Sequence, residues 1–165
     1  LMALYVSVIR GTPLLVQIFI FYYGLPSVGI ELSPITAGIL TLTLNVAAYM
    51  SETLRGSINA VTQGQWQAGT SLGLTRDQTL RYVVGPQALR AAVPSLSNSL
   101  ISLIKDTSLV SVIAVTELML ATKELISTTF QPFPLYLAAA AIYWVLSLSF
   151  EQIQRWMEKR VAYPY

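Results

Sequence analysis

Cysteine and histidine are both absent from the chain. Without cysteine there is no disulfide, no thiolate nucleophile and no iron–sulfur cluster, so the redox state of the compartment leaves no mark on the sequence. Without histidine the chain lacks the usual zinc ligand and the side chain that most often changes charge near neutral pH. We therefore expect neither a metal site nor a cofactor.

Charged residues are also scarce. Asp, Glu, Lys and Arg make up 11% of the 165 residues, whereas apolar residues make up 54%, and the mean hydropathy is +0.59. Soluble domains carry about 25% charged residues, so this composition indicates a membrane protein. The net charge is only +2 and the basic residues form no single patch, so we expect a lipid environment and no nucleic-acid partner.

No set of residues for catalysis or nucleotide binding is recognisable. The chain has no phosphate-binding glycine loop, so any ATP must be bound and hydrolysed on a separate subunit. Its carboxylates have no accompanying nucleophile or metal-ligand pattern, which argues against a hydrolase. We predict that the chain is not an enzyme.

Apolar segments recur along the chain and predict an all-α, polytopic membrane protein with about four spans. These segments cover residues 13–25, 35–50, 95–120 and 135–150. The third is divided by Lys105-Asp106-Thr107, which predicts a broken or kinked helix, because a continuous apolar span does not tolerate that charged pair cheaply. Residues 121–134, with two prolines, are predicted to be a loop.

Lysine and arginine are distributed unequally between the two predicted sides of the membrane. One side holds residues 1–10, 51–94 and the C-terminal tail, and it carries eight of the ten basic residues: Arg10, Arg55, Arg76, Arg81, Arg90, Arg155, Lys159 and Arg160. The other side carries Lys123, and Lys105 lies within a span. Since cytoplasmic loops are enriched in Lys and Arg, we predict that the first side, with the C-terminus, is cytoplasmic.

Residues 64–94 form the longest polar interruption, and we call them the coupling segment. Their pattern predicts two short amphipathic helices, over 65–72 and 76–84, separated by Gly73. Small residues in such a helix let a partner's backbone come close, and the apolar face of a helix fits a groove on another protein. A docking site is therefore predicted here; the alternative is a solvated connector between spans.

The second of these helices has recognisable end signals. Thr75 and Gln78 have the spacing of a capping box, in which each side chain binds the other residue's backbone N–H. Gly85-Pro86 is expected to end the helix, since the residue before a proline is pushed out of the helical region.

The coupling segment resembles a cytoplasmic loop in the permeases of binding-protein-dependent ABC transporters. That loop carries a Glu-Ala-Ala triplet, a glycine four residues after its last alanine, and a hydrophobic-x-Leu-Pro ending. Here Gln67-Ala68-Gly69 stands at the triplet, Gly73 at the glycine and Pro86 at the final proline. Gln67 replaces the acid, Gly69 the second alanine and Gly85 the leucine. By this resemblance Gln67, Ala68, Gly69, Gly73 and Pro86 are expected to couple the chain to an ATPase.

Three further blocks are similar to the polar amino acid branch of that family: RGTPLLVQ at 10–17, GLTRDQTLRYVVGPQALR at 73–90 and KDTSL at 105–109. The resemblance implies one permease domain over residues 1–165, in the cell inner membrane, that forms the pathway of an ATP-driven amino acid importer. It also implies ABC ATPase subunits, an extracytoplasmic substrate-binding protein and a permease homo- or heterodimer. Family members usually carry another helix before the RGTPLL block, so one span is expected to be missing.

Polar residues inside the predicted spans are candidates for a substrate site. Asp106 is an acid within a span, and such ionisable groups are functional candidates. Ser99 precedes it by seven residues and so lies on the same helical face, and Asn45 lies in the middle of another span. The alternative for each is structural, as a kink or as interhelical hydrogen bonding. Because Ser99 offers no ion pair to a basic side chain, a neutral polar amino acid such as glutamine is favoured over arginine or lysine, and an acidic amino acid remains the open alternative.

The competing interpretation of the whole chain is a membrane channel outside the ABC family, or a structural membrane subunit. A channel needs rings of carbonyl groups or charged side chains, and the sequence shows no such pattern.

Overall fold

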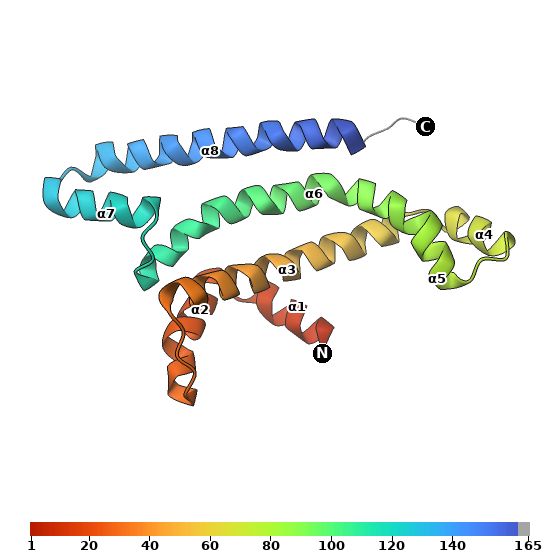
Figure 1. Ribbon diagram of the computed structural model, residues 1–165, viewed down its shortest axis with the longest axis horizontal. Helices are drawn as coiled ribbons and strands as arrows, with labels where there is room; N and C mark the ends of the chain where they lie inside the picture. The colour runs from red at the N-terminus through yellow and green to blue at the C-terminus, as the bar shows by residue number, and fades with distance from the viewer. Residues whose placement is uncertain (162–165) are drawn as a thin grey trace.

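The computed structural model describes residues 1–161, with side chains to residue 159, and this part of the chain contains helices and no strands (Figure 1). The α-helices are α1 (Met2–Gly11), α2 (Leu14–Phe19), α3 (Pro34–Ala60), α4 (Gln63–Ser71), α5 (Arg76–Thr79), α6 (Gly85–Asp106), α7 (Leu118–Thr129) and α8 (Pro132–Val161). Four π or 3-10 turns are η1 (Ile20–Gly24), η2 (Leu25–Val28), η3 (Leu80–Val84) and η4 (Thr107–Ile113). The predicted all-α class is confirmed.

Three long helices set the shape of the molecule. α6 lies between α3 and α8 and contacts both, while α1 and α2 pack against α3 (Figure 1). The chain turns by 108° between α1 and the segment of α2, η1 and η2. α4 and α5 stand at one end of the long helices and α7 at the other. Polar residues on α6 therefore face two neighbouring helices.

Two helices, α3 and α8, are long and apolar enough to cross a membrane, and the bent pair at the N-terminal end makes a third if it counts as one span. The sequence had predicted about four. α6 is rich in serine and is not among the helices that are long and apolar enough to cross a membrane. Its place between α3 and α8 explains this composition, because those helices cover part of its surface and polar groups there need not face lipid.

A small apolar cluster joins α2, α3 and η4. Its buried members are Ile18, Ala37, Val110 and Ile113. At Gly38 on α3 an added Cβ would lie 3.1 Å from Val110 Cγ1, so a small residue there lets η4 come close. This contact fixes the end of α6 against α3.

The helix predicted to stop at Gly85-Pro86 does not stop, and that expectation was wrong. The backbone stays helical from α5 through η3 into α6, with the Gly85 N–H donating to Leu80 O in a π turn. A π turn accommodates a proline that cannot continue the ordinary hydrogen-bond pattern. Glycine is required at the junction, since a Cβ on residue 85 would lie 2.7 Å from Leu80 O.

The break at Lys105-Asp106-Thr107 is confirmed: α6 ends at Asp106, and the 3-10 turn η4 follows.

The loop predicted over 121–134 is wrong for most of its length, because α7 occupies 118–129. Glu117 starts this helix by accepting hydrogen bonds from Met119 N and Leu120 N, each 2.8 Å long. Glu117 is thus an acidic N-cap residue, which is a helix start signal. The loop prediction relied on the two prolines of the segment and did not use this signal.

Candidate functional site

One cavity of about 470 Å³ brings together the three predicted substrate residues, Asn45, Ser99 and Asp106. We call it the polar cavity. It is bounded by the break between α1 and α2, by α3, and by the C-terminal half of α6 with the start of η4. Its lining residues are Thr12, Pro13, Leu14, Asn45, Val46, Tyr49, Asn98, Ser99, Ser102, Leu103, Asp106 and Leu109.

The carboxylate of Asp106 is only partly exposed, and no hydrogen bond or ion pair from the described residues reaches it. Lys105, next to it in sequence, lines a different cavity of about 430 Å³ between α6 and α8. Adjacent residues on a helix do not face each other, so the two charges do not pair. Asp106 is thus the acid of the polar cavity, and it has no ion-pair partner among the described residues.

The other two candidates are hydrogen-bonded through their donors. The Ser99 hydroxyl donates to Ser95 O (3.1 Å), one turn back on α6. The Asn45 amide nitrogen Nδ2 donates to Gln17 Oε1 (3.0 Å) on α2. The structure therefore also supports the structural alternative for Asn45, as a link between two helices, without removing its side chain from the cavity.

Gln17 is a site residue that the sequence analysis did not single out. It is 4% exposed and joins α2 to α3 and to the backbone at the end of α1. The available signal was one amide in an otherwise apolar run, PLLVQIFIF. Its partner Asn45 lies 28 residues away, a distance over which local pattern carries no information.

The coupling segment begins with a glycine-ended helix. Gly73 has a positive φ of 78°, and the Gly73 and Leu74 N–H groups donate to Thr70 O (3.0 Å) and Gly69 O (3.1 Å). This is the Schellman pattern, in which glycine takes the left-handed position. A Cβ on Gly73 would meet nothing within 4 Å, so this glycine serves the turn and leaves an open surface.

Gly69 has the opposite role. It is buried, and an added Cβ would lie 2.5 Å from Thr79 Cγ2 and 2.7 Å from Thr79 Oγ1. The glycine thus lets α4 and α5 touch. The predicted capping box is confirmed: Gln78 N donates to Thr75 Oγ1 (3.3 Å), and Thr75 N donates to Gln78 Oε1 (2.8 Å). Together these contacts make α4 and α5 one rigid corner.

The five residues assigned to coupling do not form one surface. Gln67, Ala68, Gly73 and Pro86 are exposed, whereas Gly69 is buried inside the corner. Gln67 lines a groove of about 550 Å³ together with Trp66 on α4 and residues at the end of α3. Exposed apolar side chains flank the corner, with Leu72 80% and Tyr82 65% exposed. The corner thus presents an unpartnered apolar surface beside a polar groove.

The same stretch contains the residue spacing of a serine-hydrolase motif, which the sequence analysis missed. Gly69 to Gly73 reads GTSLG and so fits the Gly-x-Ser-x-Gly spacing. In hydrolases the serine sits on a turn between a strand and a helix, whereas here it is the last residue of α4. Without a strand before it, and in a chain without histidine, this serine is not a nucleophile.

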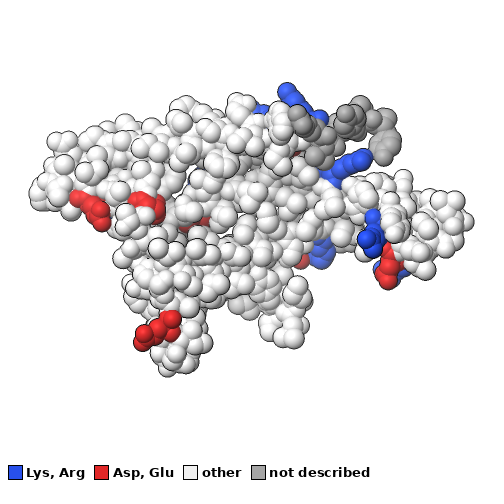
Figure 2. Space-filling model, in the orientation of Figure 1, with Lys and Arg blue, Asp and Glu red and all other residues white. Residues whose placement is uncertain are grey.

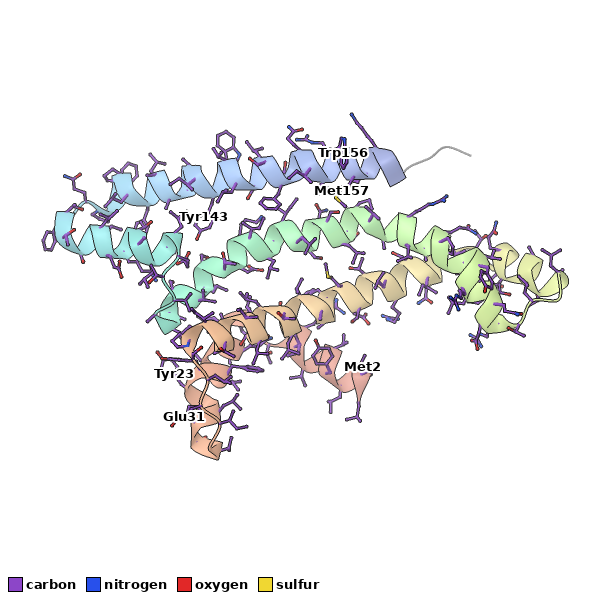
Figure 3. All side chains as sticks on the ribbon, viewed as in Figure 1. Met2, Tyr23, Glu31, Tyr143, Trp156 and Met157 are labelled. Carbon is purple, nitrogen blue, oxygen red and sulfur yellow. The ribbon has the colours of Figure 1, made fainter. Side chains whose placement is uncertain are left out.

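Charge is unevenly distributed over the molecule. On the face seen in Figure 2, the Lys and Arg side chains lie towards the end with α4, α5 and the last turns of α8, whereas acidic side chains are visible at both ends. Glu31 stands at the tip of the protrusion before α3, and Tyr143 lies on the side of α8 towards α7, where its hydroxyl donates to Glu117 (2.8 Å) (Figure 3).

Comparison with known proteins covers nearly the whole chain. Residues 1–163 match the family model described as binding-protein-dependent transport system inner membrane component. The L-cystine transport system permease protein TcyB of Bacillus subtilis is 45% identical over 160 residues, which cover 96% of this chain and 68% of that protein. The glutamine transport system permease protein GlnP of Escherichia coli K12 is 39% identical over 159 residues, covering 95% and 73%. A crystal structure of an amino acid ABC transporter with histidines matches with a TM-score of 0.90 and 40% identity, covering 96% and 74%.

Proposed function

Because the chain belongs to the family of inner membrane components of binding-protein-dependent transport systems, we propose that it forms the translocation pathway of an ATP-driven amino acid importer and holds its substrate in the polar cavity. Proteins of this family are multi-pass membrane permeases and not enzymes, and the ATPase is a separate subunit. Family membership favours this function over a channel or a structural subunit. The family also implies a substrate-binding protein and a second permease as partners.

The observation that carries the proposal is the unpaired carboxylate of Asp106 in the polar cavity. Placing an isolated charge away from water costs several kcal/mol unless a cation or hydrogen bonds compensate it. The α-ammonium group of an amino acid supplies that compensation during transit. Asn45 and Ser99 add polar contacts from α3 and from the preceding turns of α6.

The cavity favours a neutral polar amino acid, of which glutamine is our choice. Asp106 is the one acid among the lining residues, so an α-ammonium group uses it and no second acid remains for a basic side chain. Ser99 and Asn98 offer hydrogen bonds without charge. The permease GlnP, named for glutamine transport, agrees with this choice.

The coupling segment is proposed to dock on the ATPase through the corner of α4 and α5. Its contact residues would be Gln67, Ala68, Gly73 and Pro86, with Gly69 holding the corner together from inside. Since the backbone is helical without interruption from Arg76 to Asp106, a displacement of the corner is transmitted along α6 to the polar cavity. ATP binding elsewhere would in this way favour one of two states, with the cavity open to either side.

The orientation of the chain in the membrane follows from the proposed docking of the coupling segment on the ATPase. We place α4, α5 and the end of α8 on the cytoplasmic side of the inner membrane, with the C-terminus, and η2 and α7 outside. Residues 1–165 act as one transmembrane domain in this proposal, with residues 64–94 as its cytoplasmic coupling loop. The described Lys and Arg side chains at the end with α4, α5 and the last turns of α8 support this orientation. The Arg160 side chain lies outside the described residues.

The test is uptake in proteoliposomes that contain the chain, candidate ATPase subunits and a substrate-binding protein. We expect ATP-dependent accumulation of labelled glutamine, and less of arginine or glutamate. Uptake that needs no ATP and stops at equal concentrations would indicate a channel and contradict the proposal. A complex without ATPase subunits serves as the control.

A further inference from the structure

The side-chain amide of Gln17 is buried, and both of its ends are hydrogen-bonded. Its Nε2 donates towards three oxygens: Ile9 O (2.7 Å), Thr12 O (3.1 Å) and Thr12 Oγ1 (2.9 Å). Its Oε1 accepts from Asn45 Nδ2 (3.0 Å). A buried amide with all its groups engaged is held in one orientation.

Pro13 explains why Gln17 is needed at this point. In a continuous helix the N–H of residue 13 would donate to Ile9 O, but proline has no N–H, and the chain leaves the helix at Thr12 with φ −120° and ψ 146°. Carbonyl oxygens only accept hydrogen bonds, so the end of Gln17 that faces Ile9 O and Thr12 O must be the NH₂ group. The backbone break therefore determines that Oε1 points to Asn45.

This orientation determines that of Asn45 in turn. Because Gln17 presents an oxygen, Asn45 must present its NH₂ group to it. The Asn45 oxygen Oδ1 is then left for the polar cavity, and no donor in the described part of the chain reaches it. A side chain that is both donor and acceptor thus acts in the cavity through its acceptor.

Ser99 and Asp106, which also line the polar cavity, likewise keep hydrogen-bond acceptors free. Ser99 uses its hydrogen on Ser95 O, so its oxygen lone pairs remain, and the Asp106 carboxylate accepts only. Asn98, about 12 Å along α6 from Asp106, has the reverse arrangement. Its Oδ1 accepts from Gln154 Nε2 (3.3 Å) and its NH₂ group remains. Asn45, Ser99 and Asp106 therefore present acceptors to the polar cavity, whereas Asn98 presents a donor.

We propose that Gln17 is a positioning residue that makes Asn45 a hydrogen-bond acceptor in the polar cavity, so that Asn45 and Asp106 together select the ammonium end of the substrate. This inference rests on the proposed function, since it takes the polar cavity to be the substrate site. Gln17 itself does not line the cavity and acts through Asn45.

The test is equilibrium binding to the complex of the permease with its ATPase subunits in lipid nanodiscs, without the substrate-binding protein, whose own selectivity would mask that of the cavity. Labelled glutamine is displaced by glutamine, by 2-hydroxyglutaramate, which has a hydroxyl in place of the ammonium, and by 4-aminobutanamide, which lacks the carboxylate. The ratio of the affinities for glutamine and 2-hydroxyglutaramate measures ammonium selection.

In Gln17→Met the side chain keeps its length but offers no oxygen to Asn45, whose amide is then free to rotate. Hydrogen bonds to charged groups are among the stronger ones, so we expect ammonium selection to fall about tenfold. The ratio of the affinities for glutamine and 4-aminobutanamide should stay unchanged, which a general loosening of the helices would not produce.

Two matched variants separate orientation from packing. In its protonated form, Gln17→Glu donates its O–H to Ile9 O and keeps its carbonyl oxygen towards Asn45, so it should retain ammonium selection. Thr41→Val removes a buried hydroxyl that donates to Ala37 O (2.7 Å), one turn before Asn45 on α3, and should leave both ratios as they are. If the Met variant does not assemble, Gln17→Glu decides: retained selection supports the inference, and lost selection overturns it.

Failure of the inference and failure of the proposed function give different results. If the unaltered complex does not bind glutamine, or Asp106→Asn binds it equally well, the polar cavity is not the substrate site. If the unaltered complex binds glutamine and selects the ammonium group, but Gln17→Met selects it as strongly, the role of Gln17 is overturned and the proposed function stands.

Discussion

At the residue scale, single atoms decide how the two functional regions are built. In the polar cavity, Asn45 and Ser99 use their hydrogen-bond donors within the protein and leave acceptors for a ligand. In the coupling segment, the absence of one Cβ at Gly69 sets the distance between two helices. Neither feature depends on many residues, so each can be altered by one substitution with a matched control.

Gly69→Ala should open the corner of the coupling segment. The new methyl group would overlap Thr79, and overpacking of this kind costs about 1–3 kcal/mol. We expect uptake to fall several-fold at normal expression, because the docking surface is displaced. Uptake per ATP hydrolysed is the measurement.

The double variant Gly69→Ala/Thr79→Ala tests the cause. It removes the two atoms of Thr79 that come closest, and the Thr79 hydroxyl has no hydrogen-bond partner among the described residues, so little is lost with it. We expect the double variant to recover most of the coupling. A double variant as poor as Gly69→Ala would show that the contact with Thr79 is not the reason.

Ser99→Glu should change the selectivity of the importer. A second acid in the polar cavity gives the side chain of lysine or arginine an ion-pair partner, and a mismatched charge in such a site changes affinity by several kcal/mol. Competition of unlabelled lysine and arginine against labelled glutamine is the measurement. Ser95→Glu, one turn away and outside the lining, is the control; equal shifts in both variants would place the site elsewhere.

At the scale of secondary-structure elements, α6 connects the two functional regions. It carries Ser99 and Asp106 on its C-terminal half and is continuous with α5 through the π turn η3. α6 also lies between α3 and α8 (Figure 1). A rigid helix in this position can move the wall of the polar cavity when the docking corner moves.

Insertion of Gly-Gly-Ser after Val84 should separate docking from transport. The insertion interrupts the helix at η3 while α4 and α5 keep their caps, so the ATPase should still bind and hydrolyse ATP. Uptake should be lost. The same insertion after Gly29, in the turn before α3, should leave uptake near normal; if both insertions allow uptake, α6 does not transmit the movement.

Helical periodicity was enough to predict which residues of α6 share a face, since Ser99 and Asp106 are related by two turns. The capping box at Thr75 was also predictable, because its interactions are local. The continuity through Gly85-Pro86 was not, because a π turn has no sequence signal as strong as that of proline. The bond between Gln17 and Asn45 depends on the packing of α2 on α3, which no local pattern reports.

At the scale of the whole molecule, the Lys and Arg side chains visible in Figure 2 lie towards one end of the long helices, whereas acidic side chains are visible at both ends. Most of the apolar surface of α8 is exposed, including Leu137, Trp144 and Val145 at 60%, 65% and 57%. In a membrane, lipid or a second permease covers such a surface. Among the described residues, none from α8 lines the polar cavity.

Cysteine labelling should determine the orientation without further engineering, since the chain has no cysteine. Asp77→Cys, in α5, should react with a membrane-impermeant reagent only from the cytoplasm. Glu31→Cys, at the protruding tip before α3 (Figure 3), should react only from outside. The reverse pattern would place the coupling segment where no ATPase can reach it.

The central claim is that the polar cavity binds the substrate of an ATP-driven importer through Asp106, and ATP-dependent uptake of labelled glutamine by the Asp106→Asn variant tests it most directly. Asparagine keeps the size of the side chain and removes its charge. We expect uptake to fall at least tenfold while the complex with the ATPase subunits and its basal ATP hydrolysis remain, with Glu124→Gln, an exposed acid on α7, as the control at normal uptake. Normal uptake by Asp106→Asn would contradict the account.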